Sequence, residues 1–292
     1  MLQSLKITVG QVTDGSKTSE EFTNLFDKKN GMKYKSPHKQ LAYFYKGVKV
    51  ARQDQANFLI FPELFLPNDY LEKYVAKEAE ESNTIIIGGL EWTERPNRNG
   101  NRVIGNHAFV AIPSILKKNS SLPKSKATII KIPKMFPSPE EETLLNKNGY
   151  QFQSNNRLYL FQSSTVGNWA VLICFDYLNL PIQKILQTKI QTLFVVAYNK
   201  DLGYFHTLSD TLHRILFCNV VVCNSGNYGG SHSFTPYRKV HQRQVFEIKG
   251  NQVDTATTIE LPLKLLVEEQ KSVSNSHNSS FMQKPPNYDM NL

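Results

Sequence analysis

Three reactive side chains each stand directly after a short apolar stretch of the sequence: Glu63, Lys134 and Cys174. A thiol, a carboxylate and an ammonium group can together supply a nucleophile, a proton shuttle and a partner for a developing anion. Loops at strand ends are where α/β folds place their ligands, so these groups are candidates for one shared site. Each also has a simpler explanation. A glutamate can cap a helix, a lysine is usually exposed, and a cysteine in a strand is usually a small core residue.

The elements that must position these side chains are short strands that alternate with helices. Continuous apolar runs predict buried strands at residues 58–61, 84–90 and 192–197, and a strand at residues 169–173 is predicted to pair with residues 157–161. Further strands are predicted over residues 5–9, 103–112, 127–132, 157–161, 220–222, 232–234, 245–248 and 255–261. Helical spacing of apolar residues predicts helices over residues 20–26, 38–53, 69–82, 182–187 and 205–218, with one or two helical turns in 138–149. This alternation indicates a layered α/β fold.

The overall composition excludes several classes of protein. The chain has 292 residues, 40% of them hydrophobic and 20% charged, which is typical of a globular protein and not of a disordered one. No apolar run approaches the roughly 18–20 residues that span a bilayer. The first ten residues alternate polar and apolar side chains and do not resemble a signal peptide, so we expect a cytoplasmic protein. The three cysteines include no CxxC pair, which argues against a disulfide framework and against a metal site.

The excess of basic residues, 34 against 25 acidic, is concentrated in two stretches. Residues 28–52 contain eight basic residues and residues 117–134 contain six, with no acidic residue in either stretch. Four aromatic residues lie in the first stretch, Tyr34, Tyr43, Phe44 and Tyr45. Such a cluster can bind nucleic acid or an acidic partner. We favour a solvated helix face, because the apolar residues recur at helical spacing and are predicted to face a core: Leu41, Phe44, Tyr45 and Val48.

In this order and at this spacing, the three reactive residues resemble the signature of the nitrilase superfamily of carbon–nitrogen hydrolases. Glu63 ends a Phe-Pro-Glu motif, and Cys174 lies in an Ile-Cys-Phe-Asp motif. Lys134 follows Glu63 by 71 positions and precedes Cys174 by 40, intervals similar to those of the family. Other segments share the likeness, which extends from about Leu5 to Leu261: residues 7–11, 105–108 and 229–232, with Arg214 and Asn224.

The resemblance implies a role for each of these residues. Cys174 would be the nucleophile that attacks an amide or nitrile carbon, and Glu63 the general base that takes the thiol proton and later protonates the leaving amine. Lys134 would stabilise the oxyanion of the tetrahedral intermediate, with the backbone N–H of Phe175 as the second donor.

A second glutamate usually follows the lysine in this family. Glu142 is the better match in spacing and Glu141 the near alternative, and this residue would orient the lysine or assist the water that attacks the thioester. Three residues near the strand ends are candidates for substrate contact: Tyr177, Tyr198 and Asn199. His232 is a candidate for the pocket or for a surface loop.

The resemblance further implies a four-layer αββα sandwich that pairs into a homodimer or a higher homo-oligomer. We expect one carbon–nitrogen hydrolase domain over residues 1–266. Residues 267–292 would form a tail that is poorly ordered or that reaches across a partner subunit. The implied reaction is hydrolysis of a small amide or N-carbamoyl compound through a thioester on Cys174, with no cofactor or metal. Phe175 and Asp176 favour the amidase and carbamoylase branches over true nitrilases.

The chain also departs from the family pattern. The pattern often continues after the acidic residue with Arg, Pro and Glu, whereas this chain has Leu178 in place of Arg, Pro181 one position late, and no Glu. The usual Glu-Asn pair after Arg214 is missing as well. Residues 14–37 are longer than the usual connection, which suggests a lid or a partner surface. These departures leave open an alternative, a catalytically inactive binding or regulatory module that contacts nucleic acid or an acidic protein through its basic surface.

Overall fold

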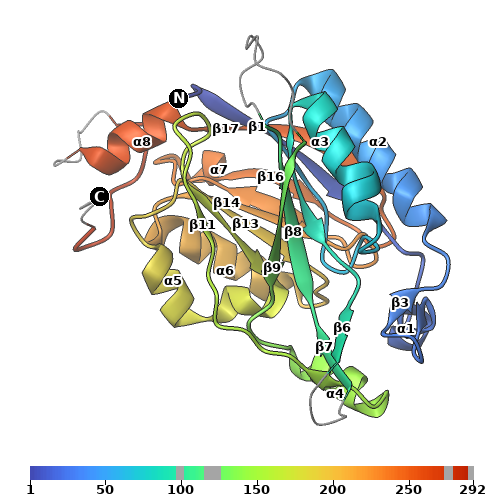
Figure 1. The fold of residues 1–292 in the computed structure, drawn as a ribbon. Helices are drawn as coiled ribbons and strands as arrows, with labels where there is room; N and C mark the ends of the chain where they lie inside the picture. The colour runs from blue at the N-terminus through green and yellow to red at the C-terminus, as the bar shows by residue number, and fades with distance from the viewer. Residues whose placement is uncertain (97–101, 115–125, 273–278, 289–292) are drawn as a thin grey trace.

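The computed structural model describes residues 1–96, 102–114, 126–272 and 279–288, and two six-stranded sheets form its centre (Figure 1). In order across the first sheet, the strands are β17 (Thr255–Pro262), β1 (Ser4–Gln11), β4 (Phe58–Ile60), β5 (Ile85–Gly89), β8 (His107–Ile112) and β9 (Thr128–Pro133). In order across the second sheet, they are β11 (Leu160–Phe161), β12 (Trp169–Ile173), β13 (Thr192–Ala197), β14 (Asn219–Asn224), β15 (Ser231–Phe234) and β16 (Gln244–Ile248). The central strands of each sheet are parallel.

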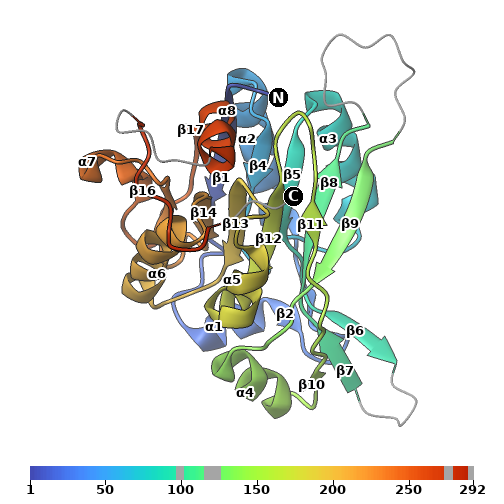
Figure 2. The same ribbon diagram turned by 90° about the vertical axis from the view of Figure 1, so that its left-hand side faces the viewer.

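Helices cover the outer face of each sheet, which gives four layers (Figure 2). The helices against the first sheet are α2 (His38–Asp54), the π-helical turn η1 (Leu71–Val75) and α3 (Ala76–Ser82). The helices against the second sheet are α5 (Leu180–Leu186) and α6 (Leu202–Ile215). The predicted α/β fold, a four-layer αββα sandwich, is therefore confirmed.

Strand β4 shows why the central strands are apolar on both faces. Phe58 belongs to the core cluster between the two sheets, where its ring centroid lies 5.4 Å from that of Trp169 and 4.8 Å from that of Phe194. Leu59, the next residue, belongs to a second cluster that includes Phe44 of α2. Each fully buried side chain of this kind contributes about 1.5–3 kcal/mol, so the continuous apolar run stabilises both interfaces.

The strands that precede the reactive residues end at one side of the molecule. Strand β5 is parallel to β4, and β8 is antiparallel to both β5 and β9, so β4 and β9 run in the same direction. Glu63 and Lys134, which follow these strands, therefore lie at the same edge of the first sheet. Short elements gather there: α1 (Ser19–Asn24), β2 (Phe26–Asp27), β3 (Lys33–Tyr34), β6 (Thr93–Pro96), β7 (Arg102–Gly105), α4 (Pro139–Lys147) and β10 (Gln151–Phe152).

Some predicted elements differ from the observed ones. The strand predicted over residues 103–112 divides at Asn106, because β7 pairs with β6 and β10 in a small sheet whereas β8 belongs to the first large sheet. The strand predicted over residues 157–161 is reduced to β11. In α2, Phe44 and Val48 are buried as predicted, but Tyr45 is 41% exposed, because one further residue turns the side chain about 100° around the helix.

The expected boundary after residue 266 falls inside a helix. The last two helices are α7 (Val240–Arg243) and α8 (Lys264–Lys271). Leu266 of α8 shares a buried cluster with Phe217 and Phe281, and Phe281 also forms a β-bridge with Tyr237. The part of the tail around Phe281 therefore packs against its own chain, whereas a contact of the tail with a partner subunit stays a prediction. Residues 273–278 and 289–292 lie outside the described part of the chain.

Among the described residues, no helix combines the length and the apolar character needed to cross a membrane.

Candidate active site

Glu63, Lys134 and Cys174 meet at one site, as the strand-end argument predicts. The Nζ atom of Lys134 lies 2.8 Å from Oε1 of Glu63, and both side chains are almost completely buried. Cys174 is 8% exposed and lines the same cavity as these two residues. A buried ammonium beside a carboxylate is stable only when it is paired and hydrogen-bonded, and the pair therefore has a defined geometry next to the thiol.

The second glutamate at this site is Glu141, and the preference for Glu142 is wrong. Oε2 of Glu141 accepts a hydrogen bond from Lys134 Nζ at 2.6 Å, whereas Glu142 is exposed. Helix α4 begins after Ser138, whose side chain caps the N–H of Glu141. This start fixes the rotation of the helix, and adjacent residues differ by about 100°, so Glu141 points to the lysine and Glu142 to solvent.

The hydrogen-bond network also includes two residues for which no role was predicted, Asn106 and Trp92. Nδ2 of Asn106 donates to Oε1 of Glu63 at 2.8 Å and to Oε1 of Glu141 at 2.7 Å. Nε1 of Trp92 donates to the same oxygen of Glu141 at 3.0 Å. In the sequence, Asn106 is marked by its place in the segment 105–108, which shares the family likeness, and by interrupting an apolar run; neither signal reveals its partners.

The protonation of the lysine and of the thiol follows from these contacts. Burial alone would lower the pKa of Lys134, but Glu141 and Glu63 outweigh it and hold the pKa well above its ordinary value. Burial raises the pKa of the Cys174 thiol well above its usual range, and Glu63 adds to this effect while Lys134 opposes it. The resting site therefore contains an ammonium group and a protonated thiol.

Cys174 directly follows β12 and is the first residue of a 3₁₀ segment, η2 (Cys174–Leu178). Its φ of 44° lies in the left-handed region, which costs a residue with a Cβ of the order of 1–3 kcal/mol. Both oxygens of Asp176, two residues later, accept the N–H of Met135 at 3.1 Å, and one of them accepts the N–H of Phe136 at 2.8 Å. Asp176 thus ties the turn that carries the thiol to the loop that carries Lys134.

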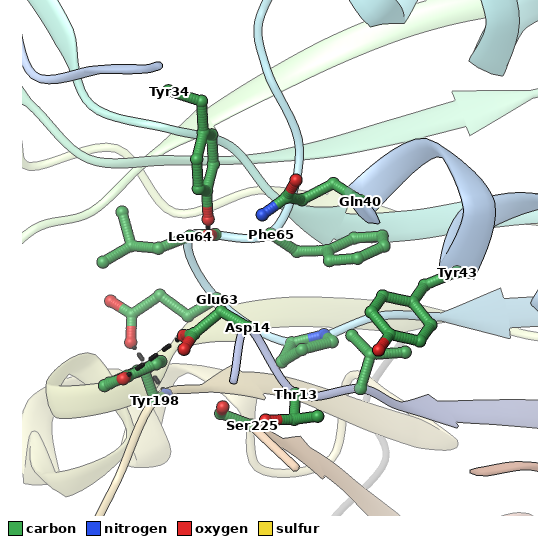
Figure 3. A pocket seen from close by; sticks show the side chains of 12 residues that line it. Thr13, Asp14, Tyr34, Gln40, Tyr43, Glu63, Leu64, Phe65, Tyr198 and Ser225 are labelled. Atoms are coloured by element: carbon green, nitrogen blue, oxygen red, sulfur yellow. Dashed lines mark hydrogen bonds between the residues drawn. The ribbon is translucent and has the colours of Figure 1, made fainter. Parts of the chain in front are cut away.

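Glu63 is held by a second strained turn. Leu64, the next residue, has a φ of 53°. A Cβ placed on Gly89 would lie 2.4 Å from Cα of Glu63, so only glycine permits this close approach. The hydroxyl of Tyr34 donates to the carbonyl oxygen of Leu64, and Figure 3 shows the Tyr34 side chain reaching Leu64.

Tyr198 supports the other oxygen of Glu63. Its backbone N–H donates to Oε2 of Glu63 at 3.0 Å, and its hydroxyl lies 3.4 Å from a carboxylate oxygen of Asp14 (Figure 3). Its ring stacks on Phe22 of α1 with centroids 4.3 Å apart. A small cavity of about 20 Å³, lined by Glu63, Asp14 and Tyr34 among others, lies here. Residues 14–37 therefore support the carboxylate through Asp14, Phe22 and Tyr34.

The predicted substrate-contact residues divide into two groups. Tyr198 and Asn199 line a cavity of about 750 Å³ that also contains Cys174 and Phe175, the predicted backbone oxyanion donor. Tyr177 is completely buried and its hydroxyl lies 3.0 Å from the Ser209 hydroxyl, so its assignment to the substrate is corrected.

His232 is buried too. Its Nε2 lies 2.7 Å from the same hydroxyl of Ser209, so it belongs neither to a surface loop nor to the cavity lining. Tyr177 and His232 thus share a polar contact in the core behind the nucleophile. Among the described residues, no cluster of three histidine, cysteine or acidic residues could hold a metal ion.

Relatives of the chain are found by structure and not by sequence. No protein-family model matches it. No curated protein matches it. An amidase from Nesterenkonia sp. superposes with a TM-score of 0.61 at 14% identity, over 92% of this chain and 94% of the amidase. A mutant of the amidase from Nesterenkonia sp. AN1, which shows Michael addition of acrylamide at the active-site cysteine, gives a TM-score of 0.60 at 13% identity, over 89% of this chain and 93% of that one.

A third solved structure, Saccharomyces cerevisiae Nit3, is a member of branch 10 of the nitrilase superfamily. It superposes with a TM-score of 0.62 at 14% identity, over 96% of this chain and 97% of Nit3. The agreement extends over nearly the whole length of each chain and includes both sheets. The chain therefore has the fold of the nitrilase superfamily.

Proposed function

We propose that the protein is a cysteine hydrolase of the amidase type, which cleaves the C–N bond of a small amide or N-carbamoyl compound. The observation that carries the proposal is the buried Glu63–Lys134–Glu141 network beside Cys174, in a cavity open to a ligand. These groups provide a nucleophile, a base and a fixed positive charge in a place that excludes most water.

In the first half of the proposed reaction, Glu63 accepts the thiol proton while the sulfur of Cys174 attacks the carbonyl carbon. A base is needed because burial keeps the thiol protonated at neutral pH. The negative charge that develops on the carbonyl oxygen is stabilised by Lys134 and by the backbone N–H of Phe175. Glu63 then protonates the leaving nitrogen, the C–N bond breaks, and an acyl thioester remains on Cys174.

In the second half, water attacks the thioester carbon while Glu63 accepts one of its protons. The C–S bond breaks, Cys174 regains a proton from Glu63, and the carboxylic acid leaves. Glu141 acts through Lys134 as a positioning residue, since its carboxylate fixes the ammonium group at 2.6 Å. An N-carbamoyl compound would react at its carbamoyl carbon by the same steps.

The structural neighbours support this reaction class. One structure of the Nesterenkonia amidase is a complex with butyramide, and another shows the acetamide moiety of fluoroacetamide bound covalently at the active-site cysteine. Those ligands are small amides, the class of compound that the Glu63, Lys134 and Cys174 arrangement suits.

Several expectations about the surroundings of this site stay predictions. They are the cytoplasmic location, a homodimer or higher homo-oligomer, the independence from a cofactor, and the alternative of an inactive module that binds nucleic acid or an acidic protein. In the first basic stretch, Arg52 pairs with Glu78 and Glu81. Much of the second basic stretch falls in residues 115–125, outside the described part of the chain.

The test combines alkylation of the thiol with amide turnover. Brief treatment with iodoacetamide, followed by intact mass measurement, should give one rapid adduct that is lost in Cys174→Ala and kept in Cys218→Ala. The adduct should form more slowly in Glu63→Gln and Lys134→Met. Release of ammonia from simple amides should be abolished in Cys174→Ala. Labelling of Cys174 at the rate of an ordinary thiol, unaffected by either substitution, would refute the proposal.

A further inference from the structure

The cavity at Cys174 is much larger than the reacting amide group. It measures about 750 Å³, within the range of sites that enclose a drug-sized molecule. Apolar and aromatic side chains from five segments contribute to its walls: Phe22, Leu144, Leu178, Tyr204, Phe205 and Tyr228. A small amide would fill only a fraction of this space.

The charged residues of the cavity are largely engaged with each other or with the backbone. Lys200, two residues before α6, pairs with Glu140 of α4 at 2.9 Å. The Asp201 carboxylate caps α6 by accepting the N–H of Tyr204 at 3.1 Å. Lys147 is exposed on α4. Apart from the Glu63–Lys134–Glu141 network, the described lining offers no buried charge to an ionic substrate group.

One wall residue is a departure from the family pattern. Leu178 occupies the position where the pattern often has an arginine, and its side chain lines the cavity four residues after Cys174. An aliphatic side chain thus stands where a cation would otherwise be expected. This residue adds to the apolar wall of the cavity that contains Cys174.

We propose that the substrate is an amide whose acyl group carries a large apolar or aromatic body, an inference that rests on the proposed hydrolase function. The amide group would lie at Cys174 and the apolar body against Leu144, Leu178 and Tyr204. Aromatic rings in the wall favour an aromatic body, which can pack edge-to-face or offset against them. A small amide leaves these apolar walls in contact with water. Only a larger substrate gains the favourable free energy of burying them.

The direct test compares kcat/KM for acetamide and 3-phenylpropionamide, two primary amides with similar intrinsic reactivity, by ammonia release. We expect kcat/KM to be at least about ten-fold higher for 3-phenylpropionamide. Tyr204→Ala and Leu144→Asn should reduce this ratio by about three-fold or more, because each substitution removes part of the apolar wall. Tyr45→Ala, which removes an exposed aromatic ring outside the cavity, is the matched control and should leave the ratio unchanged.

Binding to the Cys174→Ala variant separates this inference from the proposed function. Calorimetry should show tighter binding of 3-phenylpropionamide than of acetamide. Turnover of acetamide at an equal or higher kcat/KM would overturn the inference while the hydrolase function stands. Preferential binding without turnover by the wild type would refute the hydrolase function and support the apolar site. Failure to bind or turn over either amide would overturn both.

Discussion

Replacing Asp176 by asparagine tests whether burial controls the protonation of this carboxyl group, which lies in the turn that carries the nucleophile. Asp176 is 1% exposed, and its carboxylate accepts N–H bonds from Met135 and Phe136. Burial raises its pKa to about 7, although these bonds and the charge of Lys134 act in the opposite direction. Its ordinary pKa is 3.8, so the folded chain favours the protonated acid.

The sign and size of the effect on stability follow from these two values. Because the pKa in the folded state is the higher one, the contribution of Asp176 to stability is fully present below about pH 3.8 and is lost as the pH rises to about 7. A difference of roughly three pKa units corresponds to about 4 kcal/mol in the free energy of unfolding. The amide introduced by Asp176→Asn does not titrate, so the difference between wild type and variant isolates this contribution.

The assay is urea unfolding of wild type and Asp176→Asn between pH 5 and 8. The free energy of unfolding of wild type minus that of the variant should fall by about 1.4 kcal/mol per pH unit up to pH 7 and then level off. A difference that stays flat, or that rises with pH, would refute the reasoning and show that the N–H bonds outweigh burial.

Two further predictions use matched pairs of substitutions. Glu141→Gln removes the carboxylate that pairs with Lys134 and should lower kcat by about 100-fold in the ammonia-release assay. The matched variant Glu142→Gln should keep kcat within about two-fold of wild type. Equal effects of the two substitutions would contradict the assignment of Glu141. Gly89→Ala places a Cβ 2.4 Å from Cα of Glu63 and should lower the free energy of unfolding by more than about 3 kcal/mol. In the matched variant Gly203→Ala the added Cβ meets no atom within 4 Å, so the free energy of unfolding should stay the same or increase. A well-folded and active Gly89→Ala variant would show that the turn at Glu63 tolerates displacement.

The sequence predicts the parts of this molecule that depend on local pattern. The apolar runs before Glu63 and Cys174 identify central strands, since a strand buried on both faces has few polar positions. The strand before Lys134, β9, lies at the edge of the first sheet. Glu63 and Lys134 lie at the same edge of the first sheet because β4 and β9 run in the same direction, and Cys174 reaches the site from the end of β12 in the second sheet. Their catalytic roles stay predictions that the proposed experiments test.

The predictions that failed concern residues whose positions depend on tertiary contacts. The choice between Glu141 and Glu142 depends on the residue at which α4 begins, because this start determines which side of the helix faces Lys134. The spacing in the sequence does not show where the helix begins. Asn106 lies inside an apolar run whose composition is typical of one strand, yet the chain changes sheets there. Tyr177 follows the nucleophile closely in sequence, but the 3₁₀ turn directs it to Ser209 in the core.

The buried network beside Cys174 has a consequence for product release. Glu63, Glu141 and Lys134 have a formal charge of −1 in total, in a place where water screens charge weakly. An amide is neutral, but the carboxylic acid formed from it has an ordinary pKa of about 4 and is ionised at neutral pH. In the proposed reaction the ligand therefore acquires a negative charge beside an excess of the same sign. Hydrolysis itself would convert a tolerated ligand into a repelled one, so electrostatic repulsion would clear the site for the next turnover.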